Sequence, residues 1–451
     1  MKRAVAIALI FALSACMLFT SCGEKRLFFS AEDLIVPPLY YDEYGGLVET
    51  IQKELGKEIQ LCTPSEGDSR SAIVFDDIDG DDTEEAIVFY RSGKGEENAR
   101  MHIYDPHGDE WISCGDFGGY GPEIGSVTPE DMDKDGLKEI VVVWSVSGVA
   151  MSNVLSLYRT GSTASDYTEA ANELCSVSTL ADIDDDSYSE LFFICYSSVN
   201  GVMQRFARAL KLSAGSVVLM GEAKVDANIS GYVSLKTEKV SDSEPLRIYV
   251  DALKAGNEMI TELIYWDSEK SVLSVPLYDA ATASSNATLR YGQIRCADIN
   301  NDGIIDIPIQ KNVFGDVRKA QDPDYENVFI TEWTNYSNGK LKVVSRGVVN
   351  PEDGYMLSLE KHETEYLGAR YYPSDKCLIV YDEKSENDSE LFSVMYVATE
   401  QWDGEKYSSY IKIMQNDDGI LCAYITQSGM DAGFNERSVK EKITKFQQNG
   451  G

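Results

Sequence analysis

The chain has 451 residues, of which 43% are hydrophobic and 10% aromatic, so it is long enough for two domains and does not have the composition of a disordered protein. Its formal charge is −35 at pH 7. This charge repels the phosphates of nucleic acids and anionic lipid headgroups, so neither is expected as a direct partner.

Residues 1–22 have the pattern of an export signal. Lys2 and Arg3 form a short basic start, and residues 4–13 are apolar throughout. No later stretch is long and apolar enough to span a membrane. We therefore expect an exported protein that lies on the outer side of the cytoplasmic membrane.

Two sites in this segment resemble the lipobox of bacterial lipoproteins, Leu-Ser-Ala-Cys16 and Phe-Thr-Ser-Cys22. We favour Cys22 as the lipidated residue, because the polar residues after it would suit an exposed tether, and Cys16 is the alternative. An ordinary secretory signal cleaved near Ala15 is a third interpretation, which also gives an exported product. The lipid would be the only membrane attachment.

Residues 23–57 are expected to form a tether and a short capping helix. Leu47, Ile51 and Leu55 fall on one helical stripe, and Gly56 ends it. We expect this helix to pack against the first unit of the structure that follows.

An acidic loop of nine residues then occurs four times. The first copy reads Asp-Ile-Asp-Gly-Asp-Asp-Thr-Glu-Glu from residue 77, and the others start at residues 131, 182 and 298. Each copy has oxygen-bearing side chains at positions 1, 3, 5 and 9 and runs directly into a short apolar segment typical of a buried strand. The candidate ligands are Asp77, Asp79, Asp81, Glu85, Asp131, Asp133, Asp135, Glu139, Asp182, Asp184, Asp186, Glu190, Asp298, Asn300, Asp302 and Asp306.

The chemistry of these loops points to a hard cation. Carboxylates about 5 Å apart repel by roughly 3 kcal/mol per pair at an effective dielectric constant near 20. Oxygen ligands at alternating positions suit Ca²⁺ better than Mg²⁺, and the absence of His and Cys at ligand positions argues against zinc and copper. Position 12, which an EF-hand fills with a carboxylate, is apolar in every copy. We predict up to four calcium ions.

The spacing of the loops predicts a repeat. Their starts are 54, 51 and 116 residues apart, and the last interval is twice 58, which places a unit without ligands near residue 241, in the stretch 240–250. Periods of this length are typical of propellers or solenoids. Each unit also predicts an outer hairpin, at Met101–Cys114, Val154–Ala170, Phe206–Met220, Leu263–Val275 and Val328–Ser345. We predict a mainly β protein with a propeller of about five four-stranded blades over residues 58–349.

The loops resemble the FG-GAP (VCBS-type) repeats of bacterial surface proteins, which are related to the propeller of integrin α subunits. The resemblance covers about residues 60–350. It implies a calcium ion in the loop that joins the first two strands of a blade. Two loops depart from the family pattern, with Asp82 and Ser187 at the sixth position, where Gly is usual.

Residues 350–451 are expected to form a small C-terminal α+β domain. Strand-like runs at 355–359, 377–381, 391–398, 407–414 and 420–426 precede a helix marked by Val439, Ile443 and Phe446. The alternative is that these strands supply further blades, which would make six or seven in all.

Seven cysteines follow the export segment, at 62, 114, 175, 195, 296, 377 and 422, with no Cys-x-x-Cys pair. We interpret them as buried apolar side chains within strands, and Cys377 and Cys422 are the one pair that the pattern leaves open to a disulfide.

No catalytic motif is present in the sequence, and the three histidines, at 102, 107 and 362, are interpreted as residues of surface turns. The leading hypothesis is a monomeric, lipid-anchored, non-enzymatic surface protein that binds a protein or glycan through the face or rim opposite its calcium loops. One alternative is a polysaccharide-active lyase or hydrolase on a propeller scaffold. Another is a propeller that acts as a spacer for a working C-terminal domain.

Overall fold

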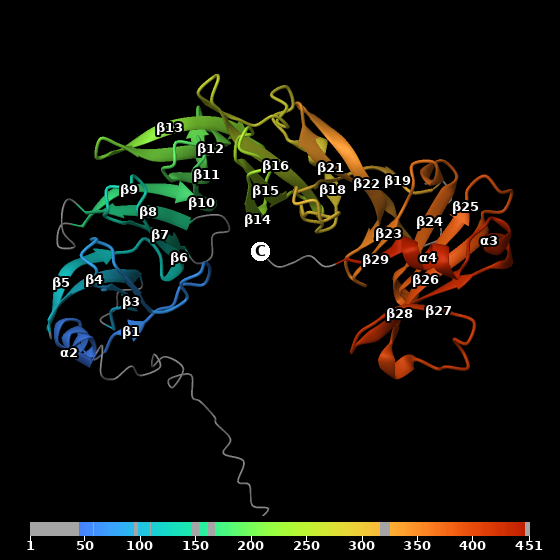
Figure 1. Ribbon diagram of the computed structural model, residues 1–451, viewed down its shortest axis with the longest axis horizontal. Coiled ribbons are helices and arrows are strands. Elements are labelled where there is room, and N and C mark those ends of the chain that lie inside the picture. The colour runs from blue at the N-terminus through green and yellow to red at the C-terminus, as the bar shows by residue number, and fades with distance from the viewer. Residues whose placement is uncertain are drawn as a thin grey trace, which may run out of the picture.

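A computed structural model describes residues 45–56, 58–93, 98–108, 110–146, 153–160, 167–315 and 325–446. The export signal with Cys16 and Cys22 and the tether up to residue 44 lie outside these residues. The described residues form a mainly β protein of six antiparallel sheets, which follow one another along an arc (Figure 1). No helix in the described ranges has the length and apolar character needed to cross a membrane.

Sheets 1 to 4 are built from strands that are consecutive in the chain. Sheet 1 contains β1 (Gln60–Leu61), β2 (Ile73–Asp76), β3 (Glu85–Arg91), β4 (Ala99–His107) and β5 (Glu110–Gly118). Sheet 2 contains β6 (Glu123–Glu130), β7 (Glu139–Ser145), β8 (Asn153–Arg159) and β9 (Thr168–Cys175). Sheet 3 contains β10 (Val177–Ala181), β11 (Glu190–Val199), β12 (Val202–Ser213) and β13 (Ser216–Val225). Sheet 4 contains β14 (Gly231–Glu238), β15 (Arg247–Leu253), β16 (Glu258–Asp267), β17 (Val272–Ser274) and β18 (Arg290–Tyr291).

The strands of sheets 5 and 6 are not consecutive in the chain, because β20 (Glu326–Asn327) belongs to sheet 6 and β29 (Ile443–Lys445) returns to sheet 5. Sheet 5 has the order β19 (Ile307–Val313), β21 (Phe329–Ser337), β22 (Lys340–Asn350), β23 (Tyr355–Ser358) and β29 (Ile443–Lys445). Sheet 6 has the order β20 (Glu326–Asn327), β24 (Leu367–Tyr372), β25 (Cys377–Asp382), β26 (Ser389–Ala398), β28 (Gly419–Ile425) and β27 (Ile411–Gln415). The helices are α2 (Gly45–Glu54), α3 (Gln427–Asp431) and α4 (Glu436–Lys442), with short 3₁₀ turns η2 (Asn286–Thr288), η4 (Glu363–Glu365), η5 (Pro373–Asp375) and η6 (Thr399–Gln401).

Neighbouring sheets pack face to face through alternate side chains of each strand. In β3, Ile87 and Phe89 pack with Trp144 of sheet 2, whereas Ala86 and Val88 point to the opposite face. Equivalent clusters join sheets 2 and 3, 3 and 4, 4 and 5, and 5 and 6. The second strand of each unit is therefore covered on both faces, which explains why its sequence is a continuous apolar run.

The outer faces of the first and last sheets are also covered. On sheet 1, Leu47 and Ile51 of α2 pack against Tyr104, so the short capping helix is present where the sequence predicts it. On sheet 6, Tyr407 from the turn before β27 packs against Cys422 of β28. Both ends of the array thus bury apolar surface without a further sheet.

The expected outer hairpins are all formed, as β4–β5, β8–β9, β12–β13, β16–β17 and β21–β22. The turn at Asn338 and Gly339 has φ values of +53° and +75°, which is the left-handed pair that a type I′ hairpin requires. The unit without ligands near residue 241 is also present, because its loop joins β14 to β15 in the register of the other loops.

The C-terminal elements differ from the expectation in four places. The strand expected at 407–414 begins only at Ile411, because Tyr407 lies in the turn that covers sheet 6. The expected helix ends at Lys442, since residues 443–445 form β29 and pair with β23. Strand β24 was not predicted. The expected domain boundary at residues 349 and 350 falls within β22, and β23 and β29 complete the same sheet.

All seven cysteines are buried and free, as expected for small apolar side chains. Cys377 and Cys422 both lie opposite Met395, one on each side of β26. Two strand spacings separate them, roughly 9–10 Å, which is too far for a disulfide.

Sheet 4 contains a buried carboxyl that is not part of any loop. Glu262 is 1% exposed, and its two oxygens accept hydrogen bonds from the backbone N–H of Asp226 at 2.7 Å and from the Ser285 hydroxyl at 2.5 Å. Burial raises the pKa of Glu262 from 4.5 to about 7, and the nearby Asp226 adds to this, whereas Lys254 opposes it.

Because the native state holds this proton up to about pH 7 and the unfolded chain loses it near pH 4.5, Glu262 lowers the stability of the fold as pH rises through that window. Glu262→Gln keeps both contacts, since its amide can accept from Asp226 and donate to Ser285. We expect the variant to gain stability over the wild type by on the order of 1–3 kcal/mol more at pH 8 than at pH 5. Thermal melts in saturating calcium measure this, and a pH-independent difference would contradict it.

Candidate metal-binding loops

The four acidic loops occupy the same position in their sheets. In the first three, the residue before the loop pairs with the carboxylate at position 9, as in Asp76 with Glu85, Glu130 with Glu139 and Ala181 with Glu190. In the fourth, an isolated bridge pairs residue 297 with residue 306 just before β19. Each loop therefore lies at the same end of a buried strand.

The carboxylate at position 1 folds the loop. In the first loop, Asp77 Oδ1 accepts from the N–H of Gly80 at 2.8 Å, and Oδ2 accepts from the N–H of Asp82 at 3.1 Å. The sixth residue is left-handed in every copy, with φ of +69° at Asp82, +91° at Gly136, +72° at Ser187 and +82° at Gly303. Asp82 and Ser187 thus adopt a left-handed conformation that Gly takes more readily.

In three of the loops, carboxylate oxygens lie close together. Ligand atoms at positions 1, 3 and 9 lie within 4.8 Å of one another in the groups Asp77, Asp79, Glu85; Asp131, Asp133, Glu139; and Asp182, Asp184, Glu190. The predicted ligands at position 5 do not belong to these groups. The Oδ1 atoms of Asp81, Asp135, Asp186 and Asp302 each accept a hydrogen bond from the backbone N–H of position 7, which leaves Oδ2 outside that bond.

The fourth loop has the same fold but is not among the groups of three acidic side chains found in the described residues. Its third position is Asn300, whose amide donates to Asp302 at 2.9 Å. Asp298 keeps its role, because it accepts from the N–H groups of Asp302 and Gly303. This loop therefore offers fewer charged oxygens than the other three.

The carboxylate at position 9 is buried in every loop. Glu85, Glu190 and Asp306 are fully buried and Glu139 is 1% exposed. In each, one oxygen accepts from the N–H of position 2, at 2.8 Å for Ile78 and Glu85. The second oxygen of Glu85, Glu190 and Asp306 has no hydrogen-bond partner. A buried oxygen without a donor is costly, and a cation would satisfy it.

The pKa values of these groups reflect the same constraint. Burial, and then the neighbouring aspartates, raise the pKa of Glu85, Glu139 and Glu190 to about 7 and that of Asp306 to about 6. A divalent ion beside these oxygens would favour their ionised form and lower the pKa values again.

The loops differ in the charges that face them from the third strand. In the second loop, Arg159 of β8 reaches Glu139 at 3.3 Å and Asp133 at 3.4 Å. In the third, Lys211 of β12 reaches Asp184 at 3.2 Å. In the first, a further acid, Asp105 of β4, instead adds to the raised pKa of Glu85. The first loop therefore concentrates the largest uncompensated negative charge.

The loop of sheet 4 has replaced the position 9 carboxylate by a cation. Glu238 pairs with Arg247 across this loop. In the other loops, the residue before the loop pairs in the same way with the carboxylate at position 9. The Arg247 side chain is 7% exposed, donates to Glu244 and lies 3.8 Å from Glu238. A guanidinium thus stands where the other loops have an acid, which explains how this loop closes without metal ligands.

Successive loops are joined by backbone hydrogen bonds. Position 8 of the second loop, Lys138, donates its N–H to Ile78 O of the first at 2.8 Å, and Ser189 of the third donates to Met132 O of the second at 3.0 Å. The position 8 side chains repeat the link, because Lys138 Nζ lies 2.6 Å from Asp76 and Ser189 Oγ lies 3.1 Å from Glu130. In the fourth loop, Ile305 N–H instead donates to the Glu238 carboxylate of sheet 4.

One histidine differs from the expectation. His102 lies within β4 at 4% exposure, stacked on Tyr104 at 4.2 Å, and is not a turn residue. Its Nε2 is 2.7 Å from Ser113 Oγ, which is the beginning of a catalytic arrangement. However, Asp116 lies 3.9 Å from Nδ1, beyond hydrogen-bond reach, and is held by Arg100. The constellation therefore lacks the group that would orient the imidazole.

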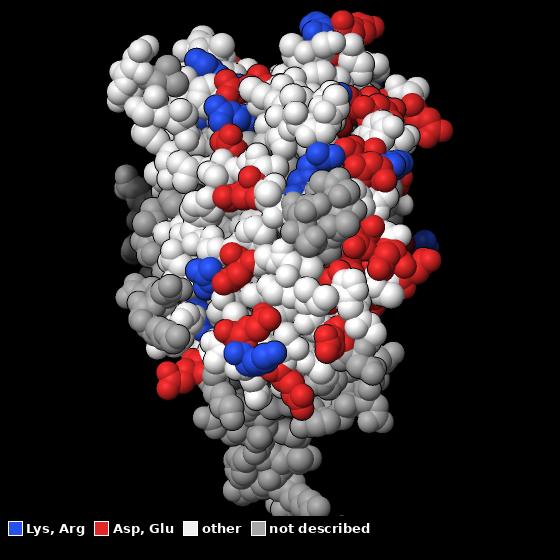
Figure 2. Space-filling view, turned by 90° about the vertical axis from the view of Figure 1, so that its left-hand side faces the viewer, with Lys and Arg blue, Asp and Glu red and all other residues white. Residues whose placement is uncertain are grey.

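Acidic side chains also gather on the surface. In a view onto the side that carries β5 and β9, Asp and Glu collect along one border and outnumber Lys and Arg (Figure 2). This distribution agrees with the net charge of −35.

Comparisons with known proteins do not place the chain in a family. No protein-family model matches it, and no curated protein matches it. Among solved structures, Sqt1 from Saccharomyces cerevisiae has 8% identity over 77% of this chain and 91% of its own, with a TM-score of 0.29. Sqt1 from Chaetomium thermophilum has 8% identity over 77% and 93%, with a TM-score of 0.31. The Bacillus licheniformis rhamnogalacturonan lyase PL11 has 10% identity over 72% and 74%, with a TM-score of 0.29. Similarity at this level carries no argument about function.

The hydrogen bonds between loops predict that ion binding is coupled along the first three sheets. Asp131→Ala should remove the middle site and also weaken divalent-ion binding in the first and third loops, because the shared backbone links lose their fixed geometry. Asp298→Ala is the matched control, since the fourth loop is joined to sheet 4 through a side chain instead. Calcium stoichiometry and affinity measured by calorimetry test this, and equal losses in both variants would contradict it.

Proposed function

We propose that this protein is an exported, lipid-anchored scaffold in which calcium ions hold a propeller-type array of β-sheets of the FG-GAP kind. In this proposal the array is non-enzymatic and presents a surface for a protein or glycan partner. Lipidation at Cys22, or at Cys16, would keep it at the cell surface, and the working form would be a monomer.

The observation that carries the proposal is the repetition of one acidic group on three consecutive sheets. Each group has a buried glutamate and two aspartates whose oxygens converge within 4.8 Å. In a single exposed acidic turn, water can solvate the charges, but water does not reach a buried carboxylate. The same arrangement with a buried carboxylate occurs three times. Oxygen-only ligands of this kind favour calcium over transition metals.

A binding role is supported by the outer strands of the sheets. Exposed apolar side chains lie on β5, β9, β13 and β17, one strand from each of the first four sheets: Ile112, Leu174, Leu219 and Val272. A partner that runs along the array could bury several of them at once. The incomplete geometry around His102 gives no comparable support to an enzyme.

We expect calcium to raise the melting temperature, because an ion that binds only the native loops stabilises the fold by about 1.4 kcal/mol per site at ten times its Kd. Differential scanning calorimetry in excess calcium and in excess chelator measures the shift. Magnesium at the same concentration should give a smaller shift. The triple variant D77N/D131N/D182N is the control, and an identical melt in calcium and chelator for the wild type would refute the proposal.

For the anchor, we expect Cys22→Ser to move the protein from the membrane fraction to the soluble exported fraction, because it removes the acylated thiol. Cys16→Ser should leave it membrane-bound. Cell fractionation shows where each variant is located, and metabolic labelling with a fatty acid analogue shows whether it is acylated. Loss of label only in Cys16→Ser would assign the alternative cysteine, and no label in the wild type would indicate an ordinary secretory signal.

A further inference from the structure

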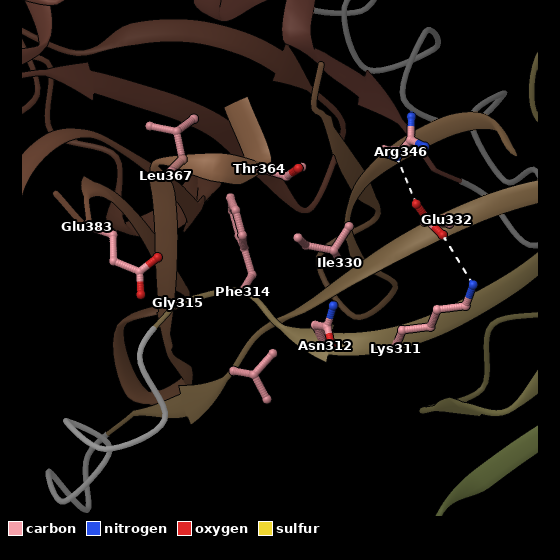
Figure 3. A pocket seen from close by; sticks show the side chains of 11 residues that line it. Lys311, Asn312, Phe314, Gly315, Ile330, Glu332, Arg346, Thr364, Leu367 and Glu383 are labelled. Atoms are coloured by element: carbon pink, nitrogen blue, oxygen red, sulfur yellow. Dashed lines mark hydrogen bonds and ion pairs between the residues drawn. The ribbon is translucent and has the colours of Figure 1, made fainter. Parts of the chain in front are cut away.

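A cavity of about 330 Å³ lies between sheets 5 and 6 (Figure 3). Its sheet 5 wall is formed by the end of β19 and by β21 and β22, and its sheet 6 wall by η4, β24 and the residue after β25. The residues that matter here are Lys311, Asn312, Glu332, Arg346, Thr364 and Glu383. The volume is at the small end of the range for ligand pockets, enough for one or two sugar rings.

The two walls are held in place by the backbone of Phe314. Its N–H donates to Val328 O at 2.6 Å, and its carbonyl accepts from the N–H of Ala369 in β24 at 3.1 Å. On the sheet 5 wall, Arg346 O accepts from Leu359 N at 2.9 Å. These hydrogen bonds fix the backbone of both walls at the boundary between the two sheets.

The surface that a ligand can reach in this cavity is more polar than apolar, although Val313 and Ile330 are half-buried and add apolar surface. Phe314 and Leu367 form the apolar floor, but each is only 1% exposed. Lys311, Asn312 and Glu383, in contrast, are exposed. A sugar ring could pack its C–H groups on the apolar side chains while its hydroxyl groups find partners on both walls.

The sheet 5 wall also carries an excess of positive charge. Arg346 Nε donates to Glu332 Oε1 at 2.8 Å, and Lys311 Nζ lies 3.9 Å from Glu332 Oε2, so one acid faces two cations. The terminal amino groups of Arg346 have no hydrogen-bond partner among the described residues. Glu332 thus orients a guanidinium whose remaining donors are available to a carboxylate, which Arg binds in a paired geometry.

We propose that this cavity binds a uronic acid sugar, with the carboxylate of the sugar on Arg346 and Lys311. The Thr364 hydroxyl and the Glu383 carboxylate on the opposite wall would bind its ring hydroxyls. This inference rests on the proposed binding role of the protein and names the ligand class. The location agrees with that role, because β19 begins at the fourth acidic loop and the cavity lies at its far end, away from the calcium sites.

The test uses the full chain with saturating calcium and, as probes, the methyl glycosides of galacturonate, glucuronate and mannuronate, with their neutral methyl esters as controls of the same shape. Binding is followed by calorimetry and by ligand-observed NMR. We expect at least one uronate to bind at least tenfold more tightly than its ester. Arg346→Gln should lose that preference, whereas Lys340→Gln, which removes a cation from an exposed position in the same strand, should retain it.

Glu332→Ala supplies a second readout, because it leaves the cations in place but removes the acceptor that orients Arg346, and it should weaken binding less than Arg346→Gln. A calcium melt of each variant shows that it is folded. Absence of any uronate binding, equal binding of acid and ester, or tighter binding of a peptide carboxyl terminus than of every uronate would overturn the assignment. Calcium stabilisation without uronate binding would leave the scaffold intact and remove only this site.

Discussion

The structure depends on the buried carboxylate at position 9 of each acidic loop, where the loop runs into the buried strand that follows it. Its backbone partner at position 2 satisfies one oxygen, and in Glu85, Glu190 and Asp306 the other is left without a donor. Because a buried charge without compensation is unfavourable, each sheet must supply or recruit positive charge at this place. That requirement is the same in every unit, although the sheets meet it differently.

The differences between units follow from the source of that positive charge. Arg159 and Lys211 reach into the second and third loops from their own sheets, whereas the first loop has Asp105 in the corresponding region. In sheet 4, Arg247 replaces the acid itself. Backbone hydrogen bonds join the first three loops in series, whereas the fourth loop is joined to sheet 4 through the Glu238 side chain. The array therefore has three linked acidic loops, followed by the sheet 4 unit, whose loop contains its own cation.

Much of this could be predicted from local sequence. The spacing of oxygen side chains identified the loops, the apolar runs identified the buried strands, and Asn338 with Gly339 identified a turn whose φ values require such residues. The sequence could not predict that position 5 accepts a hydrogen bond from the N–H of position 7, because this depends on the conformation of the folded loop. Arg159 and Lys211 were missed because the pairing of β8 with β7 and of β12 with β11 brings them back to loops that lie at least 20 residues earlier in the chain. The helix expected through Phe446 was shortened because Ile443 pairs with Leu357, a contact that no helical periodicity reveals.

The covers on the two outer faces have a consequence for how such a chain can change over time. The helix α2 protects sheet 1, and the turn with Tyr407 protects sheet 6, while the apolar clusters among the described residues join each sheet between them to its neighbours. Gene duplication or deletion of an interior unit would therefore leave both terminal seals untouched and would require new packing at only one junction. The unit with Arg247 shows that a sheet of this array can carry a cation where its neighbours carry an acid and still pack between them.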